Sequence, residues 1–246
     1  MESFIRWIGG KRLLRKRIIA EFPKQYGRYV EVFSGAGWVL FGKEASRFEV
    51  YNDIDGELVN LFRCIKYHRK AVEEELKLTF MARETFFEYR DHEALTDIQR
   101  AARFYYLIKG SYGADLRSFS CQPCDIAASM ERFPKVEERL RNVLIENKSY
   151  EAILRGYERE DTLFYLDPPY YGTEAYYRHI FSREDHCRLR ELLGNIQGYF
   201  ILSYNDDPFI RKLYEGFQMI QVDRMNNLSE NRKCYPELII KNFDIL

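Results

Sequence analysis

Short apolar runs alternate with glycine-rich or polar stretches near the start of this chain. Residues 29–33 are a mostly apolar run that ends in a glycine-rich turn, and residues 38–45 have a helical pattern. A second apolar run occupies residues 48–51, and another helical pattern begins at Gly56. Strand, glycine-rich turn, helix and strand in this order form a βαβ unit, so the pattern predicts a parallel sheet.

The hydrophobic pattern changes between residues 61 and 141. Charged stretches such as 71–78 and 98–108 have apolar residues at helical spacing, and no further βαβ signal occurs there. Residues 110–120 lack this spacing, which predicts an exposed loop. We therefore expect a helical insertion over 61–141.

Strand signals return after the insertion. Residues 143–146 favour a strand, and residues 162–166 are a continuous apolar run, as expected of a strand that is covered on both faces. These elements predict a three-layer α/β/α domain formed by residues 1–60 and 142–246, with a mostly parallel sheet. The other predicted elements are a helix at 183–193, a strand at 199–203 and an antiparallel pair at 217–222 and 238–243.

Composition places the chain among globular proteins. Of its 246 residues, 46% are hydrophobic, which is enough to form a core and excludes a disordered chain. No apolar run approaches the roughly 18 residues of a membrane span. The N-terminal residues lack the apolar region of a secretory signal, so we expect a cytoplasmic protein with no membrane partner. The sequence does not reveal the oligomeric state, and a monomer is compatible with it.

The glycine-rich turn is the first candidate binding site. Ligands of α/β sheets bind beyond the carboxyl ends of the strands, where glycines let the backbone approach them closely. Gly35 and Gly37 occupy this turn, and Asp53 follows the next strand, where a carboxylate can bind a ribose hydroxyl. A third glycine of a dinucleotide motif is missing, so a tight turn without a ligand is about as consistent with these residues.

The segment Asp167-Pro168-Pro169-Tyr170 is the strongest chemical signal. It follows a buried strand, and its two prolines stiffen the backbone. The Asp167 carboxylate and the Pro168 carbonyl are thereby presented as two hydrogen-bond acceptors at the ligand edge of the sheet. An exocyclic amine of a nucleobase is a weak nucleophile, and two acceptors on its hydrogens favour attack on an activated methyl group. Tyr170 can stack on a base that has been rotated out of its duplex.

Several motifs together resemble those of the bacterial and phage Dam-type (alpha group) N6-adenine DNA methyltransferases. They occur in the same order along nearly the whole chain: Trp7-Ile8-Gly9-Gly10-Lys11, Phe33-Ser34-Gly35-Ala36-Gly37, Asn52-Asp53 and Asp167-Pro168-Pro169-Tyr170. The resemblance implies a Rossmann-like S-adenosylmethionine-dependent methyltransferase fold in which the helical insertion 61–141 recognises the target. It also implies methyl transfer to N6 of adenine in double-stranded DNA.

The resemblance assigns roles to individual residues of this chain. Asp167, Pro168 and Tyr170 would be catalytic, with Tyr170 stacking on the flipped adenine. S-adenosylmethionine would be the cofactor, bound by the set Trp7, Lys11, Phe33, Gly35, Gly37, Asp53 and Asp167. The candidate DNA-binding residues are Tyr112, Arg117, Arg224 and Arg232.

Recognition of DNA must depend on local basic residues, because 38 Lys and Arg balance 38 Asp and Glu. Arg117 can bind a guanine through two hydrogen bonds, but its loop differs from the Asn-Gly-rich hairpin of family members that read GATC. We therefore expect GATC or a related short site. Lysines and arginines at 63, 66, 69 and 70 are a candidate phosphate-binding cluster.

Other functions fit the residues less well. Cys121 and Cys124 have the spacing of half a zinc site, but no second pair completes it, so we expect no metal. Methylation of cytosine N4 or of an amine on RNA is the main enzymatic alternative. A module that binds the cofactor and DNA without catalysis is the alternative from another class, although both Asp167 and Tyr170 are present.

Overall fold

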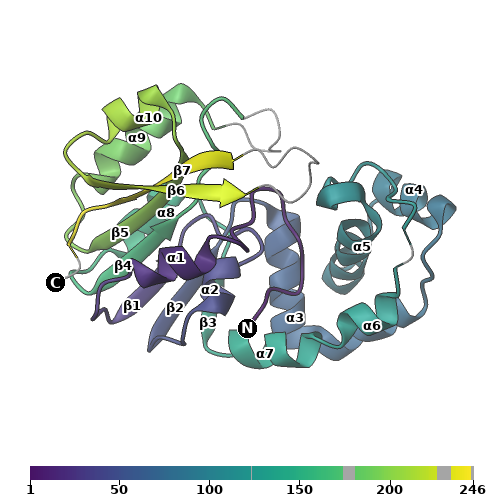
Figure 1. Cartoon of the computed structure of the whole chain (residues 1–246). Coiled ribbons are helices and arrows are strands. Elements are labelled where there is room, and N and C mark those ends of the chain that lie inside the picture. The colour runs from purple at the N-terminus through teal and green to yellow at the C-terminus, as the bar shows by residue number, and fades with distance from the viewer. Residues whose placement is uncertain (123, 174–180, 226–233, 245–246) are drawn as a thin grey trace.

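A computed structural model of the chain describes residues 1–122, 124–173, 181–225 and 234–244 (Figure 1). One seven-stranded sheet has the order β3-β2-β1-β4-β5-β7-β6. The strands that build it are β1 (Arg28–Glu31), β2 (Phe48–Asn52), β3 (Val143–Glu146), β4 (Thr162–Leu166), β5 (Tyr199–Asn205), β6 (Gln218–Met225) and β7 (Cys234–Lys241).

The sheet is mostly parallel, as the sequence predicted. Strands β3, β2, β1, β4 and β5 run parallel to one another. Strand β7 pairs antiparallel with both β5 and β6, which confirms the predicted C-terminal pair. The pair is displaced relative to the predicted ranges 217–222 and 238–243, because the backbone pairing continues beyond the apolar run as far as Met225 and Cys234.

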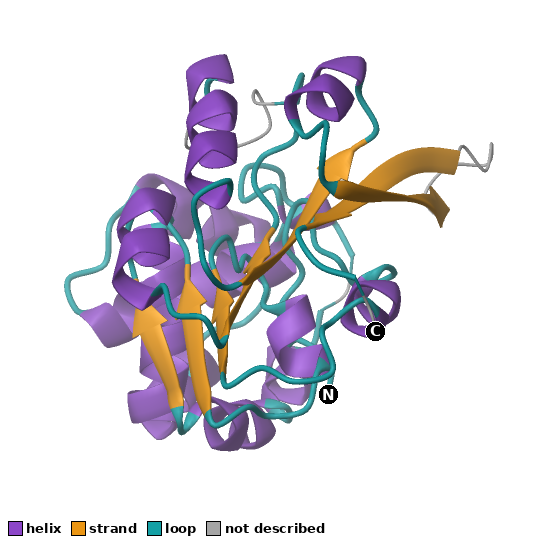
Figure 2. Cartoon of the chain, turned by 90° about the vertical axis from the view of Figure 1, so that its left-hand side faces the viewer, coloured by secondary structure: helices purple, strands orange, loops and turns teal. Residues whose placement is uncertain are grey.

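Helices cover both faces of the sheet, which gives the three layers that the sequence predicted (Figures 1 and 2). One face is covered by α1 (Arg15–Ala20), α2 (Trp38–Gly42) and the first turns of α3 (Gly56–Lys77). The opposite face is covered by α8 (Tyr150–Tyr157), α9 (Arg183–Leu193) and α10 (Pro208–Leu213).

The segment between β2 and β3 is helical. Besides α3, the described elements there are α4 (Arg83–Asp91), α5 (Asp97–Gly110), the 3₁₀ turn η1 (Tyr112–Ala114), α6 (Ile126–Met130) and α7 (Phe133–Leu140). A capping box begins α5, since Thr96 and Gln99 each bind the other's backbone N–H. The predicted helix at 98–108 lies within α5.

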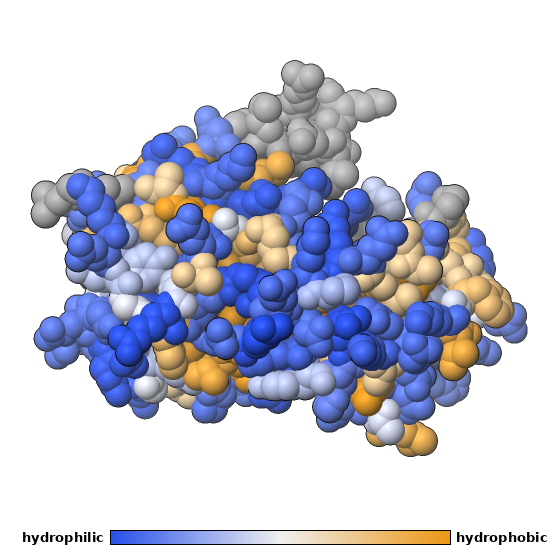
Figure 3. All heavy atoms as spheres, turned by 90° about the horizontal axis from the view of Figure 1, so that it is seen from below, coloured by the Kyte–Doolittle hydropathy of each residue, from blue (hydrophilic) through white to orange (hydrophobic). Residues whose placement is uncertain are grey.

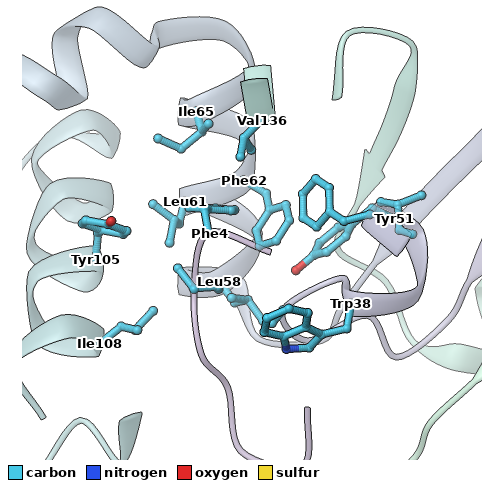
Figure 4. Packing of buried hydrophobic residues seen from close by; sticks show 14 of the residues in the cluster. Phe4, Trp38, Tyr51, Leu58, Leu61, Phe62, Ile65, Tyr105, Ile108 and Val136 are labelled. Atoms are coloured by element: carbon cyan, nitrogen blue, oxygen red, sulfur yellow. The ribbon is translucent and has the colours of Figure 1, made fainter. Parts of the chain in front are cut away.

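A shared aromatic core joins these helices to the sheet. The ring centroids of Tyr51 on β2 and Phe62 on α3 lie 4.1 Å apart in a stacked arrangement. Phe4 of the N-terminal segment packs edge-on against Phe62, and its ring stacks on that of Tyr105 of α5 (Figure 4). Helix α3, which is kinked at His68, runs from the sheet into the helical part, and both parts bury residues in one core.

Three of the four basic residues at 63–70 contact other parts of the protein. Lys66 donates a hydrogen bond to the carbonyl oxygen of Val143 at 2.7 Å, and Arg63 donates to the carbonyl oxygen of Ile145. These contacts cover the exposed edge of β3. Arg69 forms ion pairs with Glu73 and Glu137. These three side chains therefore have partners within the protein, and the phosphate-binding role of the cluster stays a prediction.

The surface in Figure 3 is mainly hydrophilic, with apolar side chains in small scattered groups. Among the described residues, no helix combines the length and apolar character that crossing a membrane requires. The sequence analysis did not predict α1, α8 or α10. Each has only six to eight residues, so its apolar periodicity spans about two turns and gives a weak signal.

Candidate active site

Polar side chains gather on one face of the sheet, at the carboxyl ends of the parallel strands. Side chains alternate between the two faces of a strand. Tyr29, Tyr165 and Ile201 all lie in the core that contains Phe4 and Phe62. Two positions after each of them along the chain come Glu31, Asp167 and Ser203. The same alternation places Glu31, Asp167 and Ser203 on that face, directed toward the N-terminal segment.

Asp167 lies where β4 ends, and two neighbours hold its carboxylate. The Lys11 ammonium nitrogen Nζ is 2.8 Å from Asp167 Oδ1, and the hydroxyl of Ser203 donates a hydrogen bond to the same oxygen at 2.8 Å. Lys11 also donates to the carbonyl oxygen of Gly9 at 2.9 Å. Burial raises the pKa of Asp167, while Lys11 opposes this effect by stabilising the ionised form.

Tyr170 is fixed beside Asp167. Its hydroxyl donates a hydrogen bond to Glu237 Oε2 at 2.5 Å, and the Lys11 Nζ lies 4.6 Å from the centre of its ring. The ring of Tyr204 lies 6.1 Å away in a tilted arrangement. Burial, with the nearby carboxylates of Asp167 and Glu237, raises the pKa of the Tyr170 phenol well above its ordinary value. The phenol therefore stays protonated and acts as a donor.

The glycine-rich turn connects β1 to α2. Gly35 has φ of 50°, a left-handed conformation that favours glycine, and a Cβ there would lie 3.0 Å from the Trp7 ring. The Gly35 N–H donates to Asp53 Oδ2 at 2.8 Å, and the Tyr51 hydroxyl donates to the Gly35 carbonyl at 2.7 Å. The turn is therefore tied to the end of β2, and Asp53 is oriented by the turn.

Glu31 is a buried carboxyl beneath this turn. It is 2% exposed, and the hydroxyl of Tyr29 donates a hydrogen bond to it at 2.6 Å. Burial raises its pKa to about 8, and the hydrogen bonds from Tyr29 and from the Leu40 backbone only partly oppose this. Glu31 is therefore a protonated, neutral group over most of the acidic to neutral range.

A cavity of about 280 Å³ lies between the N-terminal segment, the strand ends and the loop after α5. Its wall combines aromatic rings, carboxyl groups and one ammonium group. The residues with side-chain chemistry suited to a ligand are Trp7, Lys11, Glu31, Phe33, Trp38, Asp53, Asp55, Arg117 and Asp167. Four consecutive residues of the helical segment, 114–117, also line the cavity, so it is closed by both parts of the chain.

These groups fit S-adenosylmethionine. Flat rings suit its adenine, carboxylates suit hydroxyl and ammonium groups, and Lys11 suits a carboxylate. The close approach of Gly35 to Trp7 leaves no room for a Cβ, so the backbone itself forms that part of the wall.

Most of the predicted cofactor residues come together in the structure. Trp7, Lys11, Phe33, Gly35, Asp53 and Asp167 all line the cavity. Gly37 is absent from its wall and instead precedes α2 with φ of 66°. Pro168 and Tyr170 lie next to the cavity, whose wall at this point includes Pro169.

The predicted DNA-binding residues are placed only in part. Tyr112 is 73% exposed, and Arg117 is exposed on the same loop. Arg224 is in β6, but its side chain, like the whole of Arg232, lies outside the described residues. Cys121 is exposed and Cys124 half-buried, and neither lines the cavity.

Sequence reasoning gave no role to Glu31, Ser203 or Glu237. Each is a buried polar residue in a mainly apolar strand, and this departure from the apolar pattern could have indicated a functional role. No local signal places Ala114 and Leu116 at the cavity, since their position depends on how α5 packs against α3.

Comparisons with known proteins agree with this geometry. A family model described as "D12 class N6 adenine-specific DNA methyltransferase" matches residues 7–228. The chain is 29% identical to the Type II methyltransferase M1.LlaDCHI of Lactococcus lactis subsp. cremoris, over 99% of this chain and 96% of that protein. It is 26% identical to the Type II methyltransferase M.CviBI of Paramecium bursaria Chlorella virus NC1A, over 88% of each chain. It is 25% identical to a DNA adenine methylase of Haemophilus influenzae, over 97% of this chain and 90% of that protein.

Proposed function

Because this chain belongs to the family of D12 class N6 adenine-specific DNA methyltransferases, we propose that its cavity binds S-adenosylmethionine and that Asp167, Pro168 and Tyr170 receive the target adenine. The observation that carries this assignment is the position of the Asp167 carboxylate. It lies in the cavity wall, next to the ring of Tyr170 and at the end of a strand. A methyl donor and an adenine amine can therefore meet there.

S-adenosylmethionine supplies a methyl group activated by a neighbouring sulfonium. Asp53 is the residue for its ribose, and Trp7 and Phe33 are the aromatic surfaces of its site. Gly35 contributes backbone, because its left-handed conformation brings the turn close to the ligand.

The chain promotes transfer by positioning the amine. Asp167 and the Pro168 carbonyl accept the two hydrogens of N6, which favours a pyramidal nitrogen with an available lone pair. The same acceptors stabilise the positive charge that develops on nitrogen. Tyr170 stacks on the base after it has rotated out of the duplex.

Lys11 keeps Asp167 competent for this role. A buried carboxyl tends to bind a proton, and a protonated Asp167 is a poorer acceptor. The ion pair of 2.8 Å opposes the effect of burial and favours the ionised form.

Double-stranded DNA is the substrate that we propose, and residues 61–141 with the loop after α5 recognise its sequence. Arg117 is exposed on this loop and also reaches the cavity wall, so a base contact would lie close to the flipped adenine. We propose GATC or a related short site as the target.

Modification-sensing sequencing of DNA from methylation-free cells that express the chain tests this function. We expect N6-methyladenine at one short motif, and methylcytosine or an unmodified genome would contradict the proposal.

Asp167→Ala should reduce methylation more than a hundredfold while the affinity for S-adenosylmethionine, measured by calorimetry, changes less than fivefold. Turnover above a tenth of the original rate would rule out the role of Asp167. Asp53→Ala is the matched variant, because it should weaken cofactor binding instead.

A further inference from the structure

Glu237 is a buried carboxylate that the proposed chemistry leaves unexplained. It lies on β7 and is 2% exposed. Its partner in the ladder is Asn205 on β5, and it shares the sheet face of Ile239, two positions later. This is also the face of Asp167 and Ser203. The antiparallel strand thus brings a residue from the C-terminal part of the chain to the catalytic edge.

Glu237 accepts a hydrogen bond from the phenol of Tyr170. The two oxygens lie 2.5 Å apart, a short charge-assisted hydrogen bond. Tyr170 follows two prolines and lies outside any helix or strand. Backbone contacts hold its neighbours, since Asn205 donates to the Tyr171 carbonyl at 3.0 Å. The bond to Glu237 is what holds the far end of the ring, while Lys11 lies over its face.

A buried carboxylate at this position lowers the stability of the folded protein. Burying a charge costs several kcal/mol unless good partners compensate, and Glu237 also raises the pKa of Asp167 by charge repulsion. An apolar residue would satisfy the strand, because the following residues Leu238, Ile239 and Ile240 are all buried and apolar. Departures of this kind from a locally favourable sequence are expected where a residue serves function.

We propose that Glu237 is a positioning residue, which holds the Tyr170 ring by its hydroxyl in the orientation that stacks on the target adenine. This proposal rests on the proposed role of Tyr170 in the site. Glu237 is not among the residues that line the cavity, so it acts through Tyr170 on the methylation step and leaves cofactor binding unchanged.

A double-mutant cycle between the two residues tests the proposal. Steady-state methylation of a duplex that carries the mapped target site gives kcat and KM for wild type, Glu237→Ala, Tyr170→Phe and the double variant. We expect each single variant to lose roughly tenfold or more in kcat, as befits a charge-assisted hydrogen bond. The double variant should lose no more than either single variant, because both remove the same bond. Multiplied losses, or a Glu237→Ala variant within twofold of wild type, would overturn the proposal.

Conservative variants separate positioning from general destabilisation. Glu237→Gln keeps an acceptor for the phenol and should retain kcat within about threefold of wild type; a defect as large as that of Glu237→Ala would contradict the proposal. If Glu237→Ala does not fold, Tyr170→Phe measures the same bond from its other side, and wild-type kcat there would equally overturn it. Calorimetry with S-adenosylmethionine should show unchanged affinity in all of these variants.

Glu21→Gln is the matched control, because Glu21 at the end of α1 is a buried carboxylate that pairs with a residue of the same strand β7. Glu21 accepts from the buried Lys241 of β7 at 3.0 Å, far from the cavity, so its loss should lower stability without changing kcat. A failure of the proposed site would show instead as activity in Asp167→Ala, which this cycle does not include.

Discussion

Three carboxyl groups near the strand ends set the chemistry of this site at the scale of single residues. Asp167 forms an ion pair with Lys11, Glu237 accepts from Tyr170, and Glu31 has a pKa of about 8 and carries a proton at neutral pH. Because burial disfavours charge, each group needs a partner or a proton. The different partners explain how three acids can serve different roles within one small region.

Substitution of Glu31 tests its protonation. The folded protein holds this proton up to about pH 8, whereas an unfolded chain releases it near the ordinary pKa of glutamate. The stability that Glu31 contributes is therefore full below about pH 4.5 and is lost as the pH rises toward 8. Glu31→Gln removes this loss. The unfolding free energy of the variant, relative to that of wild type, should therefore increase by about 1 kcal/mol per pH unit between pH 5 and 8.

Urea unfolding without cofactor, at several pH values, measures this difference. Glu49→Gln is the control, because burial of Glu49 is outweighed by hydrogen bonds from Arg139 and Lys43 that lower its pKa. That variant should show no such gain with pH. A Glu31→Gln difference that stays constant from pH 5 to 8 would show that Glu31 is ionised in the folded protein.

At the scale of elements, the loop after α5 joins the helical segment to the cavity. An isolated bridge between Ser111 and Phe119 closes its base, and Asp115 accepts from the backbone N–H of Arg117 and of Ser118. Leu116 has φ of 61°, which costs a non-glycine residue about 1–2 kcal/mol, and it is buried. The loop thus has a defined conformation that directs Leu116 inward and leaves Arg117 exposed.

Arg117→Ala should weaken discrimination at one base pair of the target. Loss of a two-pronged contact with guanine is worth about 1–3 kcal/mol, or roughly 5- to 150-fold in relative kcat/KM. Methylation of duplexes with single base-pair changes measures this loss. Arg155→Ala on α8, exposed on the opposite helical layer, should leave the pattern unchanged. An Arg117→Ala enzyme with the wild-type preference at every position would exclude base reading by this residue.

At the scale of the whole molecule, one cavity and one core join the helical segment to the sheet. The wall includes the turn after β1, the end of β4 and residues 114–117. Phe4, Phe62 and Tyr105 lie in the same hydrophobic cluster, so α5 cannot move far without disturbing the core. Ligand binding in the cavity should therefore also stabilise the loop residues 114–117.

Hydrogen exchange with and without S-adenosylmethionine tests this coupling. A ligand that binds only the folded state reduces local opening, by about 2.7 kcal/mol at a hundred times its Kd. Amides at 34–36 and at 114–117 should both exchange more slowly, while those of α4, away from the cavity wall, should not change. Protection confined to 34–36 would show that the loop moves independently of the cofactor.

The sequence by itself determined the order of the main elements and much of the site. Apolar runs at 48–51, 143–146 and 162–166 became β2, β3 and β4, because local hydrophobicity decides which segments are buried strands. The Asp167-Pro168-Pro169-Tyr170 segment could be interpreted chemically, because its rigidity and its acceptors are local properties. Six of the seven predicted cofactor residues line one cavity. For Phe33, Gly35, Asp53 and Asp167 this follows from their position after strand ends, whereas Trp7 and Lys11 come from the N-terminal segment.

Only the tertiary structure decided the partners of these residues. Tyr170 and Glu237 are 67 positions apart in sequence, and they meet because β7 lies antiparallel beside β5. The ion pair of Lys11 with Asp167 and the entry of Leu116 into the cavity wall likewise depend on how distant segments pack. A pattern of neighbouring residues indicates which face is buried, but it does not indicate what lies against that face, and in this protein the opposing side chains provide the partners of Asp167 and Tyr170.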